Sequence, residues 1–265
     1  MAEAGVTLPP LRKFRPPLRR ALRGAGEDLL PGAANPLIAE ILDSVGGRRL
    51  VLSYDAFLAT HLDAFSERTI YPEAAMRCVR LRDLFPGHDV SFLMGIRNPA
   101  TLIPELFEAS TAEDFASFVS AFDLGSLRWS DTIEAIRGAC PDVPLTSWCH
   151  EDLPMIWPDA LRAMAGLALD EMTELEGDFA ILHQVMQQKG LARLKEYLRD
   201  NPPEHPASRR RIVSAFLDKY AEPEAIAPEI DLPGWTADLI AGLSAGYEAD
   251  VARIMRRDDV RFLTP

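Results

Sequence analysis

The sequence has few cysteines, no long apolar run and no excess of basic residues. Its three cysteines, Cys78, Cys140 and Cys149, are odd in number and form no CxxC pair, which excludes a disulfide framework and favours a reducing cytoplasm. No run reaches the roughly 20 apolar residues of a membrane span, and the N-terminus lacks the apolar core of a secretion signal. A net charge of -12 disfavours a nucleic-acid partner. We therefore expect a cytoplasmic protein without a membrane span.

Several catalytic motifs are also missing. No GxSxG segment supports a serine hydrolase, and none of the five histidines stands in a zinc-type spacing such as HExxH. The run Cys149-His150-Glu151-Asp152 contains metal-binding residue types, but adjacent residues cannot all face one ion. No second cluster completes a set of four ligands, so we expect no metal site.

The size and charge pattern of the chain indicate its organisation. With 265 residues, 48% hydrophobic and 26% charged, the chain is most simply one soluble domain. Residues 1–36 are rich in proline, glycine and arginine and are predicted to form a poorly ordered basic arm, helical at about 17–23, before a single α/β domain at 37–265. The arm could contact a membrane, a nucleic acid or an acidic partner, or be a solvated helix face. Its basic residues, opposed within residues 1–26 by Glu3 alone, are Arg12, Lys13, Arg15, Arg19, Arg20 and Arg23.

Strand and helix patterns alternate through the middle of the chain. Apolar runs predict strands at 49–53, 90–96 and 143–149, and alternation with helices favours a parallel sheet with right-handed crossovers. From residue 178 the chain reads as helical. We predict an α/β fold, a parallel sheet flanked by helices, with a helical C-terminal half. The predicted helices are 72–85, 98–109, 112–122, 129–139, 152–165, 179–188, 191–199, 208–221 and 235–256.

Residues 89–102 carry the sharpest local signal. The apolar run 90–96 reads as a strand buried on both faces, Asn98 is a favourable N-cap, and Pro99 suits the first helical turn. Arg97 then lies between a strand end and a helix N-terminus, where free N–H groups and a guanidinium outline an anion site. In the alternative interpretation, Arg97 pairs with a nearby carboxylate and has no ligand.

The segment MGIRNPATLIPELF resembles the part of P-loop sulfotransferases that holds the 3'-phosphate of PAPS (3'-phosphoadenylyl sulfate). The likeness, in particular to uncharacterised sulfotransferase-like proteins of alphaproteobacteria, runs from about Leu50 onward. It implies a P-loop transferase-like sheet, donor contacts from Arg97 and Asn98, and a hydroxyl-bearing small molecule or glycan as acceptor. His61 is then a candidate base. The segment 148–153 is similar to the family's aromatic-x-x-Glu-Asp-Leu turn, where Asp152 is expected to cap the next helix.

Two departures from the family bear on activity. Nothing before Leu50 supplies the Gly-rich phosphosulfate loop, and no pattern there predicts the first strand of the family's sheet. Where the family has a phosphate-binding Ser eight residues after the Arg, this chain has Glu105, which repels a phosphate. We therefore expect a non-catalytic homologue that does not bind PAPS. The alternatives are a sulfotransferase whose chain starts further upstream, with a further strand and loop there, and a partner-binding protein that uses the basic arm.

Overall fold

The computed structural model describes residues 5–24, 41, 48–60, 63–66, 68–226 and 229–265. Its strands are β1 (Val6–Thr7), β2 (Arg49–Leu50), β3 (Phe92–Ile96), β4 (Leu145–Cys149) and β5 (Arg261–Leu263). Its helices of six or more residues are α1 (Leu11–Gly24), α3 (Ala74–Asp83), α4 (Pro99–Glu108), α5 (Phe115–Ser120), α6 (Trp129–Ala139), α7 (Leu153–Ala165), α9 (Gln188–Asp200), α10 (Pro206–Tyr220) and α12 (Ala237–Ile254). The shorter helices are η2 (Leu124–Ser126), η3 (His150–Asp152), α8 (Leu182–Val185) and α11 (Pro223–Ile226).

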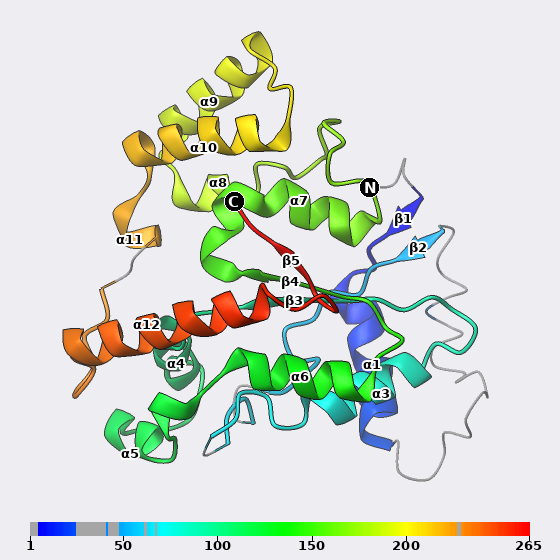
Figure 1. Ribbon diagram of the computed structural model, residues 1–265, viewed down its shortest axis with the longest axis vertical. Helices are drawn as coiled ribbons and strands as arrows, with labels where there is room; N and C mark the ends of the chain where they lie inside the picture. The colour runs from blue at the N-terminus through cyan, green and yellow to red at the C-terminus, as the bar shows by residue number, and fades with distance from the viewer. Residues whose placement is uncertain (1–4, 25–40, 42–47, 61–62, 67, 227–228) are drawn as a thin grey trace.

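The described strands form two small parallel sheets. The larger has the order β3-β4-β5, with Phe92 opposite Leu145 and Trp148 opposite Leu263. The smaller pairs β1 with β2, so the predicted strand at 49–53 does not extend the larger sheet. Its main-chain groups bond to β1 instead, as in the bond from Val51 N to Thr7 O at 2.9 Å. The expected α/β class with parallel strands and flanking helices is thus confirmed (Figure 1).

Helices cover both faces of the larger sheet. Alternate side chains of a strand point to opposite faces, and here Leu93 and Trp148 pack against α7, whereas Met94 and Ile96 belong to the core shared with α6 and α12. In Figure 1, α7 lies above the strands and α6 and α12 lie below them. This double cover explains why β3 is a continuous apolar run.

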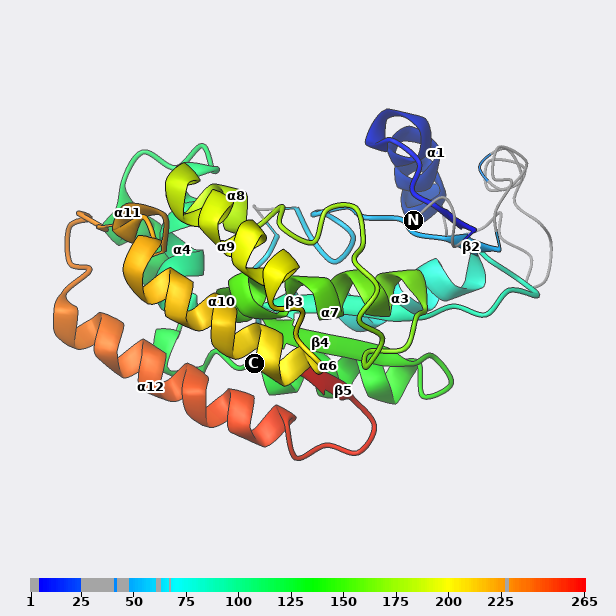
Figure 2. The same ribbon diagram turned by 90° about the horizontal axis from the view of Figure 1, so that it is seen from above.

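The C-terminal half is mostly helical, as predicted, but it also contains β5. Helices α8, α9 and α10 have a separate apolar core, in which Leu194 and Val213 are almost fully buried. Figure 2, seen from above, shows α9 and α10 lying side by side. After α12 the chain returns to the larger sheet as β5, which pairs in parallel with β4. None of the described helices is long and apolar enough to cross a membrane.

The described part of the range 1–36 contains β1 and α1, so the expected arm is folded there. Helix α1 begins at Leu11, earlier than the predicted start, and continues through two internal prolines. Phe14, Leu18 and Leu22 lie on one face and are buried against α3. Their four-residue spacing is helical, but the basic residues and prolines between them make the pattern difficult to recognise in the sequence. Residues 25–36 lie outside the described ranges.

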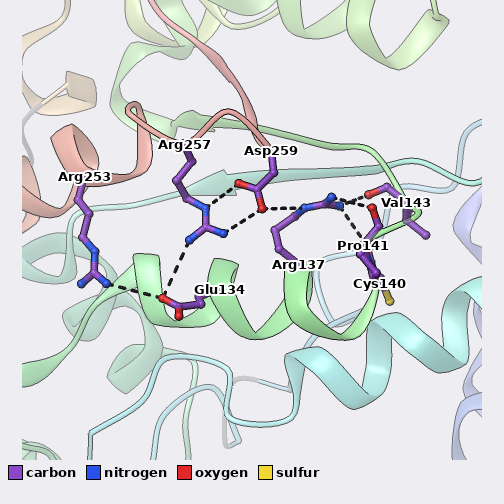
Figure 3. Close-up of polar contacts among 8 residues, drawn as sticks. All are labelled: Glu134, Arg137, Cys140, Pro141, Val143, Arg253, Arg257 and Asp259. Carbon is purple, nitrogen blue, oxygen red and sulfur yellow. Dashed lines mark hydrogen bonds and ion pairs between the residues drawn. The ribbon is translucent and has the colours of Figure 1, made fainter.

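An ion-pair network joins the segment before β5 to α6 (Figure 3). The carboxylate of Asp259 accepts hydrogen bonds from Arg257 at 2.9 Å and from Arg137 at 3.4 Å. Arg137 also donates to the main-chain carbonyls of Cys140, Pro141 and Val143, which close the turn from α6 to β4. The network therefore fixes the turn that leads into β4 and the turn that leads into β5.

Candidate functional site

The carboxyl ends of β3 and β4 bring together the residues that the sequence singled out. Ile96 lies opposite Cys149 in the ladder, so Arg97 and His150 leave the sheet at the same edge. In parallel sheets this edge, outside the carboxyl ends of the strands, is where ligands usually bind. The start of α4, the turn η3 and the middle of α12 surround this position.

Asn98 begins α4 in the way the sequence predicts. Its side-chain oxygen accepts a hydrogen bond from Ala100 N at 2.9 Å, and Pro99 occupies the first helical position. Its side-chain nitrogen donates to Ser244 of α12 at 2.8 Å. The predicted N-cap is confirmed, and it is also a tether between β3 and α12.

Arg97 is bound by residues of α4, the helix that follows it. Its Nε donates to Thr101 Oγ1 at 3.2 Å, and its guanidinium forms an ion pair with Glu105. The Arg97 side chain is 24% exposed and that of Glu105 is 60% exposed, so the pair lies at the surface. The alternative in which Arg97 pairs with a carboxylate of the chain is therefore the arrangement that the structure has. The carbonyl of Arg97 accepts a bond from Trp129 Nε1 at 2.8 Å, which fixes the backbone.

A second carboxylate, that of Glu151, accepts a hydrogen bond from the backbone N–H of this turn. Glu151 Oε1 accepts a hydrogen bond from Asn98 N at 2.8 Å, and Glu151 Oε2 accepts one from the Tyr247 hydroxyl at 3.0 Å. The carboxylate of Glu151 thus occupies the helix N-terminus that was expected to face an anion. Both features of the predicted anion site, the guanidinium and the backbone N–H, have carboxylate partners from the chain itself.

Burial and neighbouring charges shift the pKa values of three titratable groups beside this pair. Desolvation first, and the positive charge of Arg97 second, lower the pKa of His150 below its ordinary value. Burial raises the pKa of the Cys149 thiol to about 11, so it stays protonated and is a poor nucleophile at neutral pH. Burial also raises the pKa of Tyr247 well above its usual range, with the Cys149 hydrogen bond as a second cause. The lowered pKa keeps the His150 imidazole neutral at neutral pH.

Asp152 differs from its predicted role. It stands directly before α7, at the N-cap position, but its side chain makes no capping hydrogen bond. Burial, followed by the charge of Glu151, raises the pKa of Asp152, while a hydrogen bond with Cys149 opposes that rise. The carboxyl group of Asp152 therefore does not cap α7.

Sequence reasoning missed two members of the site. They are Tyr247 and Ser244, both on α12. The signal available in the sequence for Tyr247 is that it recurs at helical spacing with apolar residues, and a tyrosine hydroxyl needs a partner when it is buried. The candidate base His61 lies outside the described residues.

The charge balance of the site is unfavourable for anions. Arg97 supplies one positive charge. Glu105 pairs with Arg97 and Glu151 bonds to the neighbouring Asn98 N, so two negative charges lie beside it. In the part of the chain that the structure describes, no three histidine, cysteine, aspartate or glutamate side chains are arranged to hold a metal ion. Comparison with protein families, with curated proteins and with solved structures found no match to this chain.

Proposed function

We propose that this chain is a sulfotransferase-like protein that does not bind PAPS as it stands and has a non-catalytic, binding role. The observation that supports the proposal is the ion pair between Arg97 and Glu105. A 3'-phosphate on Arg97 would have to displace a carboxylate that is carried by the helix following Arg97 and is always present at high local concentration. Glu105 is the residue that replaces the family's phosphate-binding serine.

Electrostatics work in the same direction. A unit negative charge placed about 4 Å from a carboxylate near a protein surface is repelled by about 4 kcal/mol at an effective dielectric constant of 20. A phosphate on Arg97 would approach both Glu105 and Glu151, because Glu151 holds the adjacent Asn98 N–H. Solvent around the exposed Glu105 weakens its share of this repulsion.

Titration with 3'-phosphoadenosine 5'-phosphate, the desulfated donor, tests the proposal. We expect no saturable calorimetric signal from the wild-type chain and a weak, saturable one from Glu105→Ser, which removes the competing carboxylate. Glu108→Ser is the matched control, because Glu108 is an exposed glutamate of the same helix without a bond to Arg97. Saturable binding at micromolar concentrations by the wild-type chain would refute the proposal.

A second candidate is a PAPS-dependent sulfotransferase acting on a hydroxyl-bearing small molecule or glycan. In this proposal the donor loop comes from sequence upstream of Met1, Arg97 and Asn98 hold the donor, and His61 is the base. The observation that favours it is that β3 has a neighbouring strand on one side only, among the described residues, so another parallel strand has room to pair. The candidate is removed if the upstream codons encode no strand and Gly-rich loop. It is also removed if a chain extended by those codons fails to transfer sulfate.

A third candidate is a partner-binding protein that uses the basic face of α1. Arg12, Lys13 and Arg15 are exposed, whereas the opposite face of α1 is buried. Deleting the helix would uncover Phe14 and Leu18, so the charges have to be changed alone. The triple variant with glutamate at positions 12, 13 and 15 is expected to lose any partner retained by the wild-type chain in a pull-down, and retention of every partner would contradict this role.

A further inference from the structure

A cavity lies between α7, the segment 171–178, α9 and α10, away from the cluster around Arg97. Its volume is about 620 Å³, within the range of small-molecule sites, and it shares no residue with the cluster around Arg97. The cavity has an apolar wall that includes Met155, Pro158, Phe179 and Leu198, together with several charged side chains. It therefore has the mixed lining that binding sites for small polar molecules have.

The charges of this cavity are unevenly paired. Its lining contains five basic side chains, from Arg162, Lys195, Arg199, Arg209 and Arg210, and five acidic ones, so its formal net charge is zero. Arg210 pairs with Asp159 at 3.1 Å, whereas the Arg162 guanidinium donates only to main-chain carbonyls among the described residues. An anion is therefore favoured only where a cation lacks a close carboxylate among the described residues, which is the case at Arg209 and Lys195. The cavity's exposed glutamates, which are solvated and contribute less, are Glu171, Glu174 and Glu196.

Arg209 is incompletely paired and lies against an aromatic ring. Its side chain is 13% exposed, and its Nη2 stays 3.8 Å from Asp178 Oδ2, beyond hydrogen-bond distance. Its guanidinium carbon lies 5.4 Å from the centre of the Phe179 ring, and Lys195 Nζ lies 4.9 Å from the same centre. Lys195 has no carboxylate partner among the described residues. Two cations with unused donors thus meet at one ring in the cavity.

Asp178 lacks a hydrogen-bond donor for one of its carboxylate oxygens. Its side chain is 3% exposed, and its Oδ1 is buried without a hydrogen-bond partner among the described residues. An unsatisfied buried carboxylate oxygen costs free energy, and a hydroxyl group from a ligand would satisfy it. The segment that carries Asp178 is held in place, because Trp157 Nε1 donates to Gly177 O at 2.9 Å.

We propose that this cavity binds a small organic monoanion that also carries hydroxyl groups. The acidic group contacts Arg209 and Lys195, and a hydroxyl group donates to Asp178 Oδ1. The apolar wall covers the carbon skeleton. A carboxylate and a sulfate ester supply the same single charge, so the recognition chemistry is shared between hydroxy acids and sulfated polyols.

Isothermal titration of the full chain tests this site with four probes. Gluconate and glucose 6-sulfate carry one charge and several hydroxyls, hexanoate carries the charge alone, and glucose carries hydroxyls alone. We expect saturable binding of gluconate or glucose 6-sulfate below about 10 mM, and binding at least about tenfold weaker for hexanoate and glucose. The preferred probe tells which acid group the site takes. Failure of both hydroxylated anions to bind, or equal binding of hexanoate, would overturn the proposal.

Variants tie the binding to the cavity. Arg209→Gln is expected to weaken binding at least about tenfold, whereas Arg211→Gln, an exposed arginine two residues along the same helix, is expected to leave it within about twofold. If Arg209→Gln fails to fold by circular dichroism, the exposed Lys195→Gln takes its place, with a loss of about threefold or more expected. Binding that is insensitive to the folded cavity variants would place the anion elsewhere and overturn the assignment.

Discussion

The carboxylate of Glu151 accepts a hydrogen bond of 3.0 Å from the hydroxyl group of Tyr247. Because Glu151 also accepts from Asn98 N, this contact joins β3, β4 and α12 at one point. The same carboxylate fills the helix N-terminus of α4, so the feature that looks like an anion site has a structural use in this chain.

Removal of the Tyr247 hydroxyl tests how much this contact stabilises the fold. Tyr247→Phe keeps the packing of the ring and leaves Glu151 Oε2 without its donor, so we expect a loss of about 1 kcal/mol in the free energy of unfolding, measured in urea. Tyr197→Phe, on the exposed surface of α9, is the control and should change stability by less than about 0.5 kcal/mol. Equal effects would show that Tyr247 acts by packing alone.

The pKa of His150 reports the charges of the site. Arg97 lowers this pKa and Glu151 raises it, so Arg97→Gln is expected to raise the pKa and Glu151→Gln to lower it. The imidazole proton shifts of His150, followed by NMR against pH, measure both changes, and the exposed His205 is the internal control. A pKa of His150 unchanged in both variants would contradict the geometry given for the site.

Gly166 is a position where a side chain cannot be accommodated. It ends α7 with φ of 71°, and a Cβ there would collide with the Arg49 guanidinium. Arg49 Nε donates to Met164 O at 2.8 Å, so moving it breaks the cap of α7. We expect Gly166→Ala to lower the free energy of unfolding by about 1–3 kcal/mol. Gly242→Ala, on the exposed face of α12 with open space around it, should instead raise it by about 0.5–1 kcal/mol.

The Asp259 network predicts a pH dependence. The hydrogen bond from Arg257 holds the pKa of Asp259 below its ordinary value, with Arg137 adding to the effect. The stabilisation is therefore complete above the unfolded-state value near 3.9 and is lost as pH falls through the lower folded-state pKa. Asp259→Asn should cost about 0.5–1 kcal/mol at pH 7 and flatten the acid limb of the stability curve, whereas the exposed Asp258→Asn should not. Parallel acid limbs in wild type and Asp259→Asn would count against the network.

Contiguous signals in the sequence predicted their structures well. The helix at 129–139 has the expected bounds, and the turn of Arg97, Asn98 and Pro99 forms as expected because a strand end, an N-cap and a first-turn proline follow one another directly. Such features depend on neighbouring residues, whose chemistry is visible in the sequence.

Long-range pairing was beyond the sequence. Strands β1 and β5 have two and three residues, too few to show an alternating pattern, and they exist only because β2 and β4 offer an edge. The bond from Asn98 N to Glu151 joins residues 53 positions apart. No local pattern indicates that Glu151, which stands just before α7, bonds to the N-terminus of α4, a helix much earlier in the chain.

The tethers of α12 also bear on how fast the chain folds. The bond between Asn98 and Ser244 spans 146 residues, and the bond between Glu151 and Tyr247 spans 96. Contacts this distant in sequence form only after a large loss of loop entropy, which slows folding in proteins rich in them. We therefore expect the carboxyl edge of the larger sheet to assemble late, after the rate-limiting barrier. Weakening either tether should then accelerate unfolding while leaving the refolding rate nearly unchanged.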